Sequence, residues 1–345
     1  MRTLITAISV ALGSTLVALP AVHAAPRAAA PAKLSIMVGG LAKQIYLPNE
    51  LAARLGYFQK EGLDVTLIDE PSGQSSEDAT VAGQVQAGSG AYQHTMELQV
   101  LGKSLETVVQ LGIAPGEAEM VATKEAGSIH SFKDLRGKKL GVTELGSGTH
   151  AISKFLLLKA GVPVDQVSFI PVGAGDTFIA AMQQGHIDAG MTTEPTISRL
   201  VSTGQGKVLV DLRTPAKTKK ALGSAFPFIS VFMSTSYVNS HKSVVQHLVN
   251  AYVRTLHWIH THTAAQIAAH LPADYYAGDK ALYVNALNAQ KAMFSPNGQM
   301  PKGGPQVVLK LERATNDQVG TKAVNLSTTY TNAYVKTADK LLGIK

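Results

Sequence analysis

The residues best suited to chemistry lie in a glycine- and hydroxyl-rich loop at 144–150. A short apolar run at 140–142 precedes it and an apolar pattern of helical period follows it, which is typical of a strand, a tight loop and a helix N-terminus. The backbone N–H groups of 146–149 and the hydroxyls of Ser147 and Thr149 can then point at one oxygen-rich ligand, helped by the helix dipole. The loop predicts an anion-binding site, with a simple helix cap as the alternative.

Length and composition favour two folded domains. The 345 residues are 45% hydrophobic and 16% charged, enough to bury large cores. The formal net charge of the chain is +7, which weakly favours an anionic ligand. The Lys and Arg residues are not gathered in tracts, so the charge argues against nucleic acid as a partner. The absence of cysteine excludes disulfides, thiol catalysis and a lipid-modified cysteine.

The first residues have the pattern of an export signal. Arg2 precedes an apolar run over 4–19, and the residues before Ala24 are small enough for a signal peptidase. We expect a signal peptide at 1–24, cleaved after Ala24, and a disordered tether at 25–33. The apolar run is short for a membrane span, so the mature protein is expected in the periplasm without an anchor.

Strands and helices alternate over the first two thirds of the chain. The predicted strands before the C-terminal third are 34–38, 63–68, 91–92, 140–142, 167–170 and 188–191. An order of strand, loop, helix, glycine and strand occurs twice, about a hundred residues apart, and aligns Gly88 with Gly185. The repetition predicts two α/β lobes built to one plan.

Two further strand-like runs are expected to connect these lobes as crossover hinge strands. They lie near 119–123 and 228–234, which assigns 34–118 and 235–345 to lobe I and 119–234 to lobe II. Two crossings form a hinge, and a hinge leaves a cleft that opens and closes on a ligand. The C-terminal third is expected to be helical and to pack on lobe I.

Other site chemistries fit the residues less well. The spacing around Ser147 is not that of a nucleophile elbow, and the dinucleotide fingerprint lacks its third glycine, so we expect neither an enzyme nor a cofactor. His257 and His260 share a helix face while His262 points elsewhere, so no metal site is expected. An exported structural or adhesive domain stays open, and titration with small anions tests it.

Five segments, taken in order between residues 34 and 234, resemble the periplasmic solute-binding proteins of nitrate/sulfonate/taurine-type ABC importers. They are 55–65, 131–142, 146–150, 185–189 and the pair Glu194-Pro195. The resemblance implies an α/β, two-lobed periplasmic-binding-protein fold of type II, with the ligand between the lobes. It also implies a monomer whose partners are a membrane permease and its ATPase. The family often has an aromatic residue before the Glu-Pro pair, where this chain has Thr192 and Thr193, so no particular sulfonate is implied.

The same resemblance implies which loops line the cleft. The residues expected at the ligand are Gly40, Gln44, Tyr46, Tyr92, His94, Thr95, Ser147, Gly148, Thr149, His150, Gly175, Asp176 and Glu194. The expected ligand is a small organic anion, such as a sulfonate, taurine or a carboxylate. A pyrimidine (thiamine) precursor, stacked on an aromatic ring and held by an acid, is the alternative.

Overall fold

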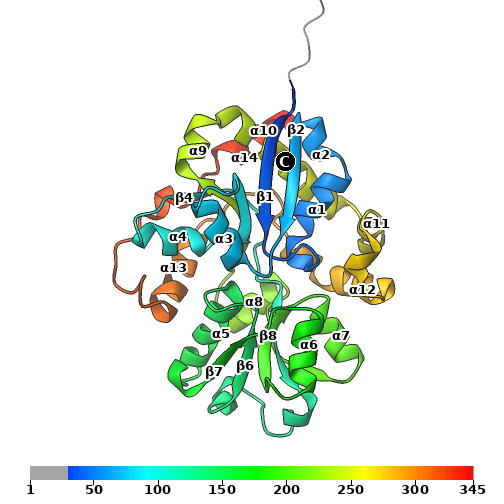
Figure 1. The fold of residues 1–345 in the computed structure, drawn as a ribbon, viewed down its shortest axis with the longest axis vertical. Helices are drawn as coiled ribbons and strands as arrows, with labels where there is room; N and C mark the ends of the chain where they lie inside the picture. Colours follow the sequence, from blue (N-terminus) through cyan, green and yellow to red (C-terminus); the bar gives the residue numbers. More distant parts are fainter. Residues whose placement is uncertain (1–29, 345) are drawn as a thin grey trace, which may run out of the picture. The chain divides into compact units, whose positions relative to one another are not determined.

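Two mixed five-stranded sheets form the framework of the structure, a computed structural model that describes residues 30–344. The first has the order β2-β1-β3-β10-β4, with β1 (Ala32–Val38), β2 (Leu63–Asp69), β3 (Ala87–Ala91), β4 (Leu105–Gln110) and β10 (Ile229–Ser234). The second has the order β7-β6-β8-β5-β9, with β5 (Glu117–Ala122), β6 (Lys139–Val142), β7 (Ser168–Pro171), β8 (Ala189–Thr193) and β9 (Gly206–Asp211). In each sheet three parallel strands are followed by one antiparallel strand, β10 or β5. Figure 1 labels the parallel strands β1 and β2 of the first sheet and β7, β6 and β8 of the second.

The predicted signal peptide at 1–24 and the first part of the predicted tether, 25–29, lie outside the described residues. The tether was expected to reach residue 33, but β1 begins at Ala32, which pairs with Leu63 of β2. Within the described part of the chain, no helix has both the length and the hydropathy that crossing a bilayer requires.

Helices connect and cover the strands. They are α1 (Leu47–Arg54), α2 (Tyr57–Lys60), α3 (Gly73–Val81), α4 (His94–Val100), α5 (Gly148–Lys159), α6 (Asp176–Gln183), α7 (Thr196–Ser202), α8 (Pro215–Leu222), α9 (Thr235–Ser240), α10 (Lys242–Thr261), α11 (Ala264–Ala268), α12 (Lys280–Gln290), α13 (Gly304–Thr315) and α14 (Ala333–Leu342). The long helix α10 buries Val245, Leu248, Val249, Tyr252 and Leu256. This helical spacing gives one apolar face, which explains why α10 packs on its neighbours.

The predicted repetition of elements is present, but its register differs from the predicted one. The glycine equivalent to Gly185 is Gly83, because each ends a helix with a positive φ, +76° and +73° respectively. Gly88 lies inside β3 instead, where an added Cβ would meet the ring of Phe232 at 2.4 Å. Helix ends and tight strand packing both select glycine, so one glycine could not define the alignment.

Two links join the sheets. Residues 111–116 lead from β4 to β5, and residues 212–228, which include α8, lead from β9 to β10. The links lie side by side, since the amide of Phe228 donates to the carbonyl oxygen of Gly112 at 2.9 Å and the amide of Gly116 to that of Leu212 at 3.1 Å.

The runs predicted as crossings, 119–123 and 228–234, fall mostly within the sheets themselves. β5 is hydrogen-bonded between β8 and β9, and β10 between β3 and β4. A continuous apolar run predicts a buried strand, but it does not say whether the strand ends a sheet or leaves it.

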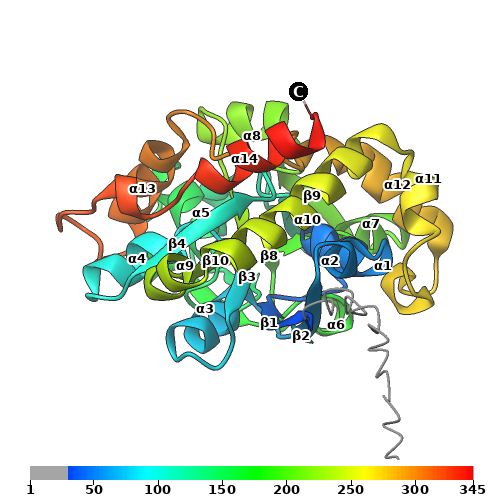
Figure 2. The same cartoon turned by 90° about the horizontal axis from the view of Figure 1, so that it is seen from above.

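The C-terminal helices contact elements of both sheets. α10 and α14 run beside each other and pack on strands of the first sheet, as Figure 2 shows from above. α13 contacts α5, and α12 contacts α7, both of which belong to the second sheet's side. The C-terminal third therefore packs on the first sheet and also reaches across to the second.

The buried apolar residues of the described chain form one large cluster and smaller ones. The large cluster extends from Ile36 and Val231 of the first sheet, through Phe228 of the second link, to Ile152 of α5. A separate cluster that includes Phe178 lies on the side of the second sheet covered by α6 and α7. The α5 face of the second sheet is thus the face continuous with the first sheet's core.

Candidate functional site

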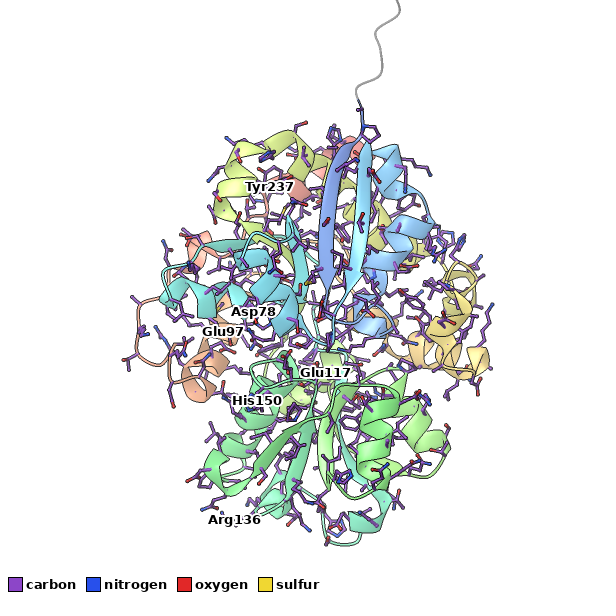
Figure 3. The ribbon with its side chains drawn as sticks, viewed as in Figure 1. Asp78, Glu97, Glu117, Arg136, His150 and Tyr237 are labelled. Carbon is purple, nitrogen blue, oxygen red and sulfur yellow. The ribbon has the colours of Figure 1, made fainter. Side chains whose placement is uncertain are left out.

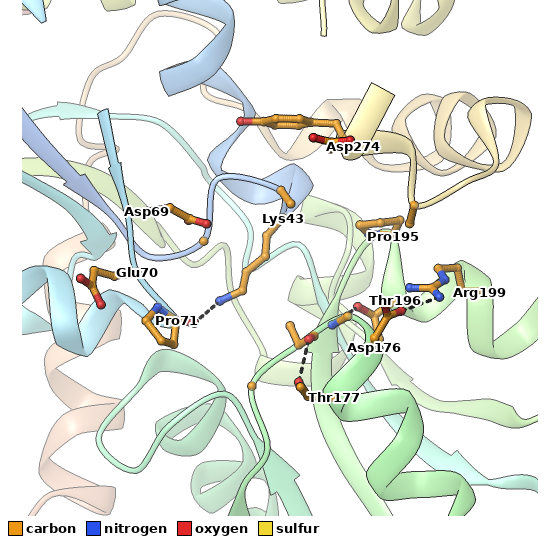
Figure 4. A pocket seen from close by; sticks show the side chains of 17 residues that line it. Lys43, Asp69, Glu70, Pro71, Asp176, Thr177, Pro195, Thr196, Arg199 and Asp274 are labelled. Atoms are coloured by element: carbon orange, nitrogen blue, oxygen red, sulfur yellow. Dashed lines mark hydrogen bonds and ion pairs between the residues drawn. The ribbon is translucent and has the colours of Figure 1, made fainter. Parts of the chain in front are cut away.

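Two hollows lie where the two sheets approach each other. The inner cavity has a volume of about 20 Å³, room for about one water molecule. Its lining residues are Lys43, Ile45, Tyr46, Gly73, Ala91 and His94 from the first sheet's side, Glu117, Thr143, Ser147, Gly148, Thr149 and Thr193 from the second, and Phe228 from a link. The outer groove is open, has a volume of about 490 Å³ and shares Lys43 with the cavity (Figure 4). We take the inner cavity as the candidate site, because polar groups from both sheets converge on it.

The start of α5 supplies backbone donors to the inner cavity. Ser147 is the N-cap residue, so the amides of Gly148 and Thr149 open the helix and have no intrahelical acceptor. The hydroxyls of this loop bond mainly to each other: Thr143 Oγ1 lies 3.0 Å from Ser147 Oγ and 3.0 Å from Thr149 Oγ1. The hydroxyls therefore brace the loop, and its amides are the groups best placed to bind an anion.

His94 supplies a donor from the opposite sheet. Its Nδ1 lies 2.7 Å from Glu77 Oε2 and 2.9 Å from Glu97 Oε2, and the ring is fully buried. Burial alone would lower the pKa of His94, but the charges and hydrogen bonds of Glu77 and Glu97 outweigh it and raise the pKa well above its ordinary value. Within the described residues Nε2 has no hydrogen-bond partner. His94 therefore borders the cavity as an imidazolium with one N–H to offer.

Glu77, His94 and Glu97 also form the candidate metal-binding group among the described residues. Their ligating atoms lie within 4.8 Å of one another. A metal would need Nδ1 without its proton, whereas here Nδ1 shares that proton with two carboxylates. The predicted absence of a metal site stays a prediction. His260 and His262 bond to carbonyl oxygens of Ser295 and Trp258 instead, so that histidine group does not converge.

Glu117 brings a carboxylate to the cavity. It is the first residue of β5, pairs in register with Thr193 of β8, and is only 2% exposed. Burial raises its pKa well above the ordinary value, although the charge of Lys43 opposes this. In the described part of the chain, Glu117 Oε2 and Thr193 Oγ1 have no hydrogen-bond partner. Figure 3 shows Glu117 at the level where the two sheets meet.

Lys43 lies between the cavity and the groove. Its Nζ donates to the carbonyl oxygens of Gly39 and Pro71 at 2.7 and 2.6 Å, and the second of these bonds is drawn in Figure 4. Burial lowers the pKa of Lys43 to about 8. This lysine therefore ties two loops of the first sheet's side together beside the cavity.

The residues expected at the ligand divide into three groups. At the inner cavity are Tyr46, His94, Ser147, Gly148 and Thr149. In the outer groove are Gly40, Gly175 and Asp176. Neither hollow is lined by Gln44, Tyr92, Thr95, His150 or Glu194.

Three of the outlying residues hold the first sheet's side together. Gln44 is buried and its side chain donates to the carbonyl oxygen of Tyr283 at 2.9 Å. The hydroxyl of Tyr92 bonds to Thr329, and Thr95 Oγ1 donates to the carbonyl oxygen of Tyr92 at 2.9 Å. Their polar groups are thus used within the protein.

The other two are engaged on the second sheet's side. His150 Nδ1 accepts the amide of Gly146 at 3.0 Å, and burial lowers its pKa to about 4, so it offers no positive charge. Glu194 is fully buried, pairs with Arg213 at 2.6 Å and accepts the amide of Ser198 at 3.0 Å. A carboxylate with these partners is not available to a ligand.

Sequence reasoning missed Lys43, Glu117, Thr143 and Thr193 as cavity residues. One signal for Glu117 was present, because two glutamates alternate within the otherwise apolar run of β5. Alternate residues of a strand face the same side, so a charged pair in such a run indicates a buried polar site.

Two sheets of equivalent strand order, joined by two links and enclosing a polar cavity, define the periplasmic-binding-protein fold of type II. The sequence model described as NMT1/THI5 like matches residues 46–265, more than half of the chain. The chain therefore belongs to the NMT1/THI5-like family.

Solved structures agree with this fold. A protein from Bordetella bronchiseptica RB50 is 34% identical, with a TM-score of 0.86 over 90% of this chain and 98% of that one. The alkanesulfonate-binding protein SsuA from Xanthomonas axonopodis pv. citri, bound to MOPS, is 18% identical, with a TM-score of 0.68 over 88% and 99%. The periplasmic nitrate-binding protein NrtA from Synechocystis PCC 6803 is 15% identical, with a TM-score of 0.70 over 92% and 90%. The last two similarities show the fold alone.

The chain spans about half the length of the curated relatives it matches. One is the 4-amino-5-hydroxymethyl-2-methylpyrimidine phosphate synthase of Aspergillus parasiticus, which is 27% identical over 164 residues. The match covers 47% of this chain and 46% of that protein. The chain is therefore similar in sequence to proteins named as synthases and in structure to proteins named as binding proteins.

Proposed function

We propose that this protein is the periplasmic receptor of an ABC importer, which binds a small organic anion and delivers it to a permease and its ATPase. The observation that carries this proposal is the inner cavity, where donors from both sheets converge. The amides of Gly148 and Thr149 come from the second sheet's side and the imidazolium of His94 from the first. A shared anion stabilises the arrangement in which the sheets are together, which is the signal that a receptor needs.

Access to the cavity requires movement. A volume of about 20 Å³ holds about one water molecule, so the sheets must separate for an organic ligand to enter and must close around it less tightly than in this arrangement. We propose residues 111–116 and 212–228 as the hinges of that motion, since they are the two links between the sheets. In this proposal the protein acts as a monomer without catalytic activity, after export and cleavage behind Ala24.

A pyrimidine precursor is the second candidate ligand. The printed names of the curated relatives and the rings of Tyr46 and Phe228 at the cavity favour it, because aromatic side chains can stack on a flat ring. A screen that contains both ligand classes separates the two candidates.

The first experiment is a thermal-shift screen of the mature protein, followed by calorimetric titration of every compound that raises the melting temperature. The panel contains nitrate, ethanesulfonate, taurine, benzoate and 4-amino-5-hydroxymethyl-2-methylpyrimidine phosphate. We expect a rise with at least one organic anion, because a ligand that binds only the folded state stabilises it. No rise with any member would contradict the proposal.

A variant then tests the site. Replacing Ser147 and Thr149 together by Ala removes two hydroxyls that brace the α5 loop. We expect binding to weaken by a few kcal/mol at most, since each lost hydrogen bond costs roughly 1 to 3 kcal/mol. Tyr92→Phe is the matched control, because it removes a buried hydroxyl that bonds to Thr329 away from the cavity. Unchanged affinity in the double variant would contradict the assignment of this site.

A further inference from the structure

Glu117 is an acidic side chain at the inner cavity whose Oε2 has no hydrogen-bond partner among the described residues. The two acids among the residues expected at the ligand both pair with arginines. Asp176 pairs with Arg199 at 2.6 Å, and Glu194 pairs with Arg213 at 2.6 Å. If an acid recognises part of the ligand, Glu117 is the one placed to do so.

The nearby lysine does not satisfy Glu117 by contact. Lys43 Nζ donates to the carbonyl oxygens of Gly39 and Pro71, at 2.7 and 2.6 Å, rather than to the carboxylate. A buried carboxylate without a partner is costly, and this burial raises the pKa of Glu117. A ligand group that donates N–H bonds to Glu117 would stabilise its ionised form. Thr193, its register partner on β8, adds a second unpartnered oxygen beside it.

The remaining polar groups of the cavity favour the opposite charge. His94 presents an N–H of a protonated ring, and Gly148 and Thr149 present the positive end of α5. The cavity therefore combines groups that attract an anion with one that attracts a cation. A ligand with only a negative charge would leave the free Glu117 oxygen without a donor, whereas an ammonium group would stabilise the ionised form that burial, by raising the pKa of Glu117, disfavours.

We propose that the ligand is a small organic zwitterion, whose anionic group meets His94 and the start of α5 and whose ammonium group meets Glu117. This proposal rests on the proposed function, because it specifies which small organic anions the same cavity selects. Glu117 is then the specificity-determining residue of the site. Compounds that differ only in an amino group should differ in affinity.

The experiment uses matched pairs of probes and matched variants. Calorimetric titration compares taurine with ethanesulfonate and β-alanine with propionate, on the wild-type protein, Glu117→Gln and Glu119→Gln. Glu119 is the control because it is also buried and on the same face of β5, but it bonds to Ser153 and is absent from the cavity lining. Glutamine keeps the shape of either side chain and removes its ability to ionise.

We expect wild-type and Glu119→Gln protein to prefer the amino member of a pair by about tenfold to a hundredfold, as charge-assisted bonds do. Glu117→Gln should lose this preference while it still binds the anion. Equal affinity within both pairs in the wild type would overturn the inference and leave the proposed function intact, even if Glu117→Gln does not fold. A preference that persists in Glu117→Gln would also overturn it. Failure of every anion to bind, in these pairs and in the screen, would instead overturn the proposed function.

Discussion

At the residue scale, a buried carboxylate of β5 contributes to how the stability of the protein depends on pH. Glu119 is completely buried, and one of its oxygens accepts a hydrogen bond from Ser153 at 2.9 Å while the other has no partner among the described residues. Burial raises its pKa to about 8. The folded protein thus holds a proton on Glu119 that the unfolded chain releases near the ordinary value of 4.5.

Glu119→Gln is expected to flatten the pH dependence of stability. Between about pH 4.5 and pH 8 the unfolded wild type binds fewer protons than the folded one, so its free energy of unfolding falls as the pH rises. Glutamine removes this contribution, so the variant should lose less stability over that range. The difference should amount to a few kcal/mol, because a tenfold change in proton affinity corresponds to about 1.4 kcal/mol. Urea denaturation at several pH values measures it.

The control for this prediction is Glu125→Gln. The hydrogen bond from Lys138 lowers the pKa of Glu125, so this group titrates below the range of interest in both states. Its replacement should leave the slope between pH 5 and pH 8 as in the wild type. Parallel curves for wild type and Glu119→Gln would contradict the assignment.

At the element scale, the start of α5 is fitted against the second link between the sheets. A Cβ added at Gly148 would meet Phe228 Cζ at 2.3 Å, which is closer than real contacts allow. Phe228 belongs to the large apolar cluster and also borders the cavity. The position of the helix start, and with it the aim of its amides, therefore depends on having no side chain at residue 148.

Gly148→Ala should destabilise the protein although alanine favours helices. Alanine gains about 1 kcal/mol in helix propensity over glycine, whereas overpacking a core costs typically 1 to 3 kcal/mol. The cost of the clash should exceed the gain in helix propensity, so the free energy of unfolding should fall by about 1 kcal/mol. Ligand binding should also weaken, because α5 shifts. Urea denaturation and calorimetric titration test both effects.

Gly127→Ala is the matched control, because an added Cβ there meets nothing within 4 Å. It should change neither stability nor affinity by a measurable amount. If Gly148→Ala proved as stable as the wild type and bound its ligand equally well, the close fit of α5 against Phe228 would contribute to neither stability nor binding.

At the scale of the whole molecule, a polar contact holds the two sheets' sides together beside the cavity. Glu144, in the loop before α5, accepts hydrogen bonds from Ser72 and from Ser75, the latter at 3.1 Å. Both serines lie at the start of α3 on the first sheet's side, where a carboxylate is favoured by the helix dipole. The contact exists only while the sheets are together.

Glu144→Gln should weaken ligand binding without touching the cavity. Loss of the charge makes the joined arrangement less favourable, and the apparent affinity falls with the fraction of protein in the binding-competent state. A charged hydrogen bond is worth about 1.5 to 3 kcal/mol, so the loss should be of the order of tenfold. Calorimetric titration and small-angle scattering with and without ligand measure the two consequences.

The control changes a carboxylate whose partners lie on one side only. Glu61→Gln alters contacts with Asn250 and His247, at 2.9 and 3.1 Å, within the first sheet's side. Its affinity should equal that of the wild type. Wild-type affinity in Glu144→Gln would show that this contact does not contribute to closure.

The local sequence pattern was sufficient to predict much of the framework and the centre of the site. The strand before the α5 loop, the N-cap Ser147 and the helix after it are set by neighbours within a few residues, so the sequence alone predicted an anion-binding helix start there. The repeated order of elements could also be predicted, because each unit is formed by residues close together in the sequence. Its register was not, since helix ends and close strand contacts both use glycine.

Tertiary structure alone decided which polar residues are free to bind. Glu194 matched the family pattern, but Arg213 occupies it, and His150 is held by the loop amide of Gly146. Glu117 carried only a weak signal, because its surroundings include residues far away in sequence, such as the charged Lys43 and its strand partner Thr193. Spacing along the chain determines where elements begin and end, whereas the partners and desolvation of a side chain depend on which distant segments pack against it.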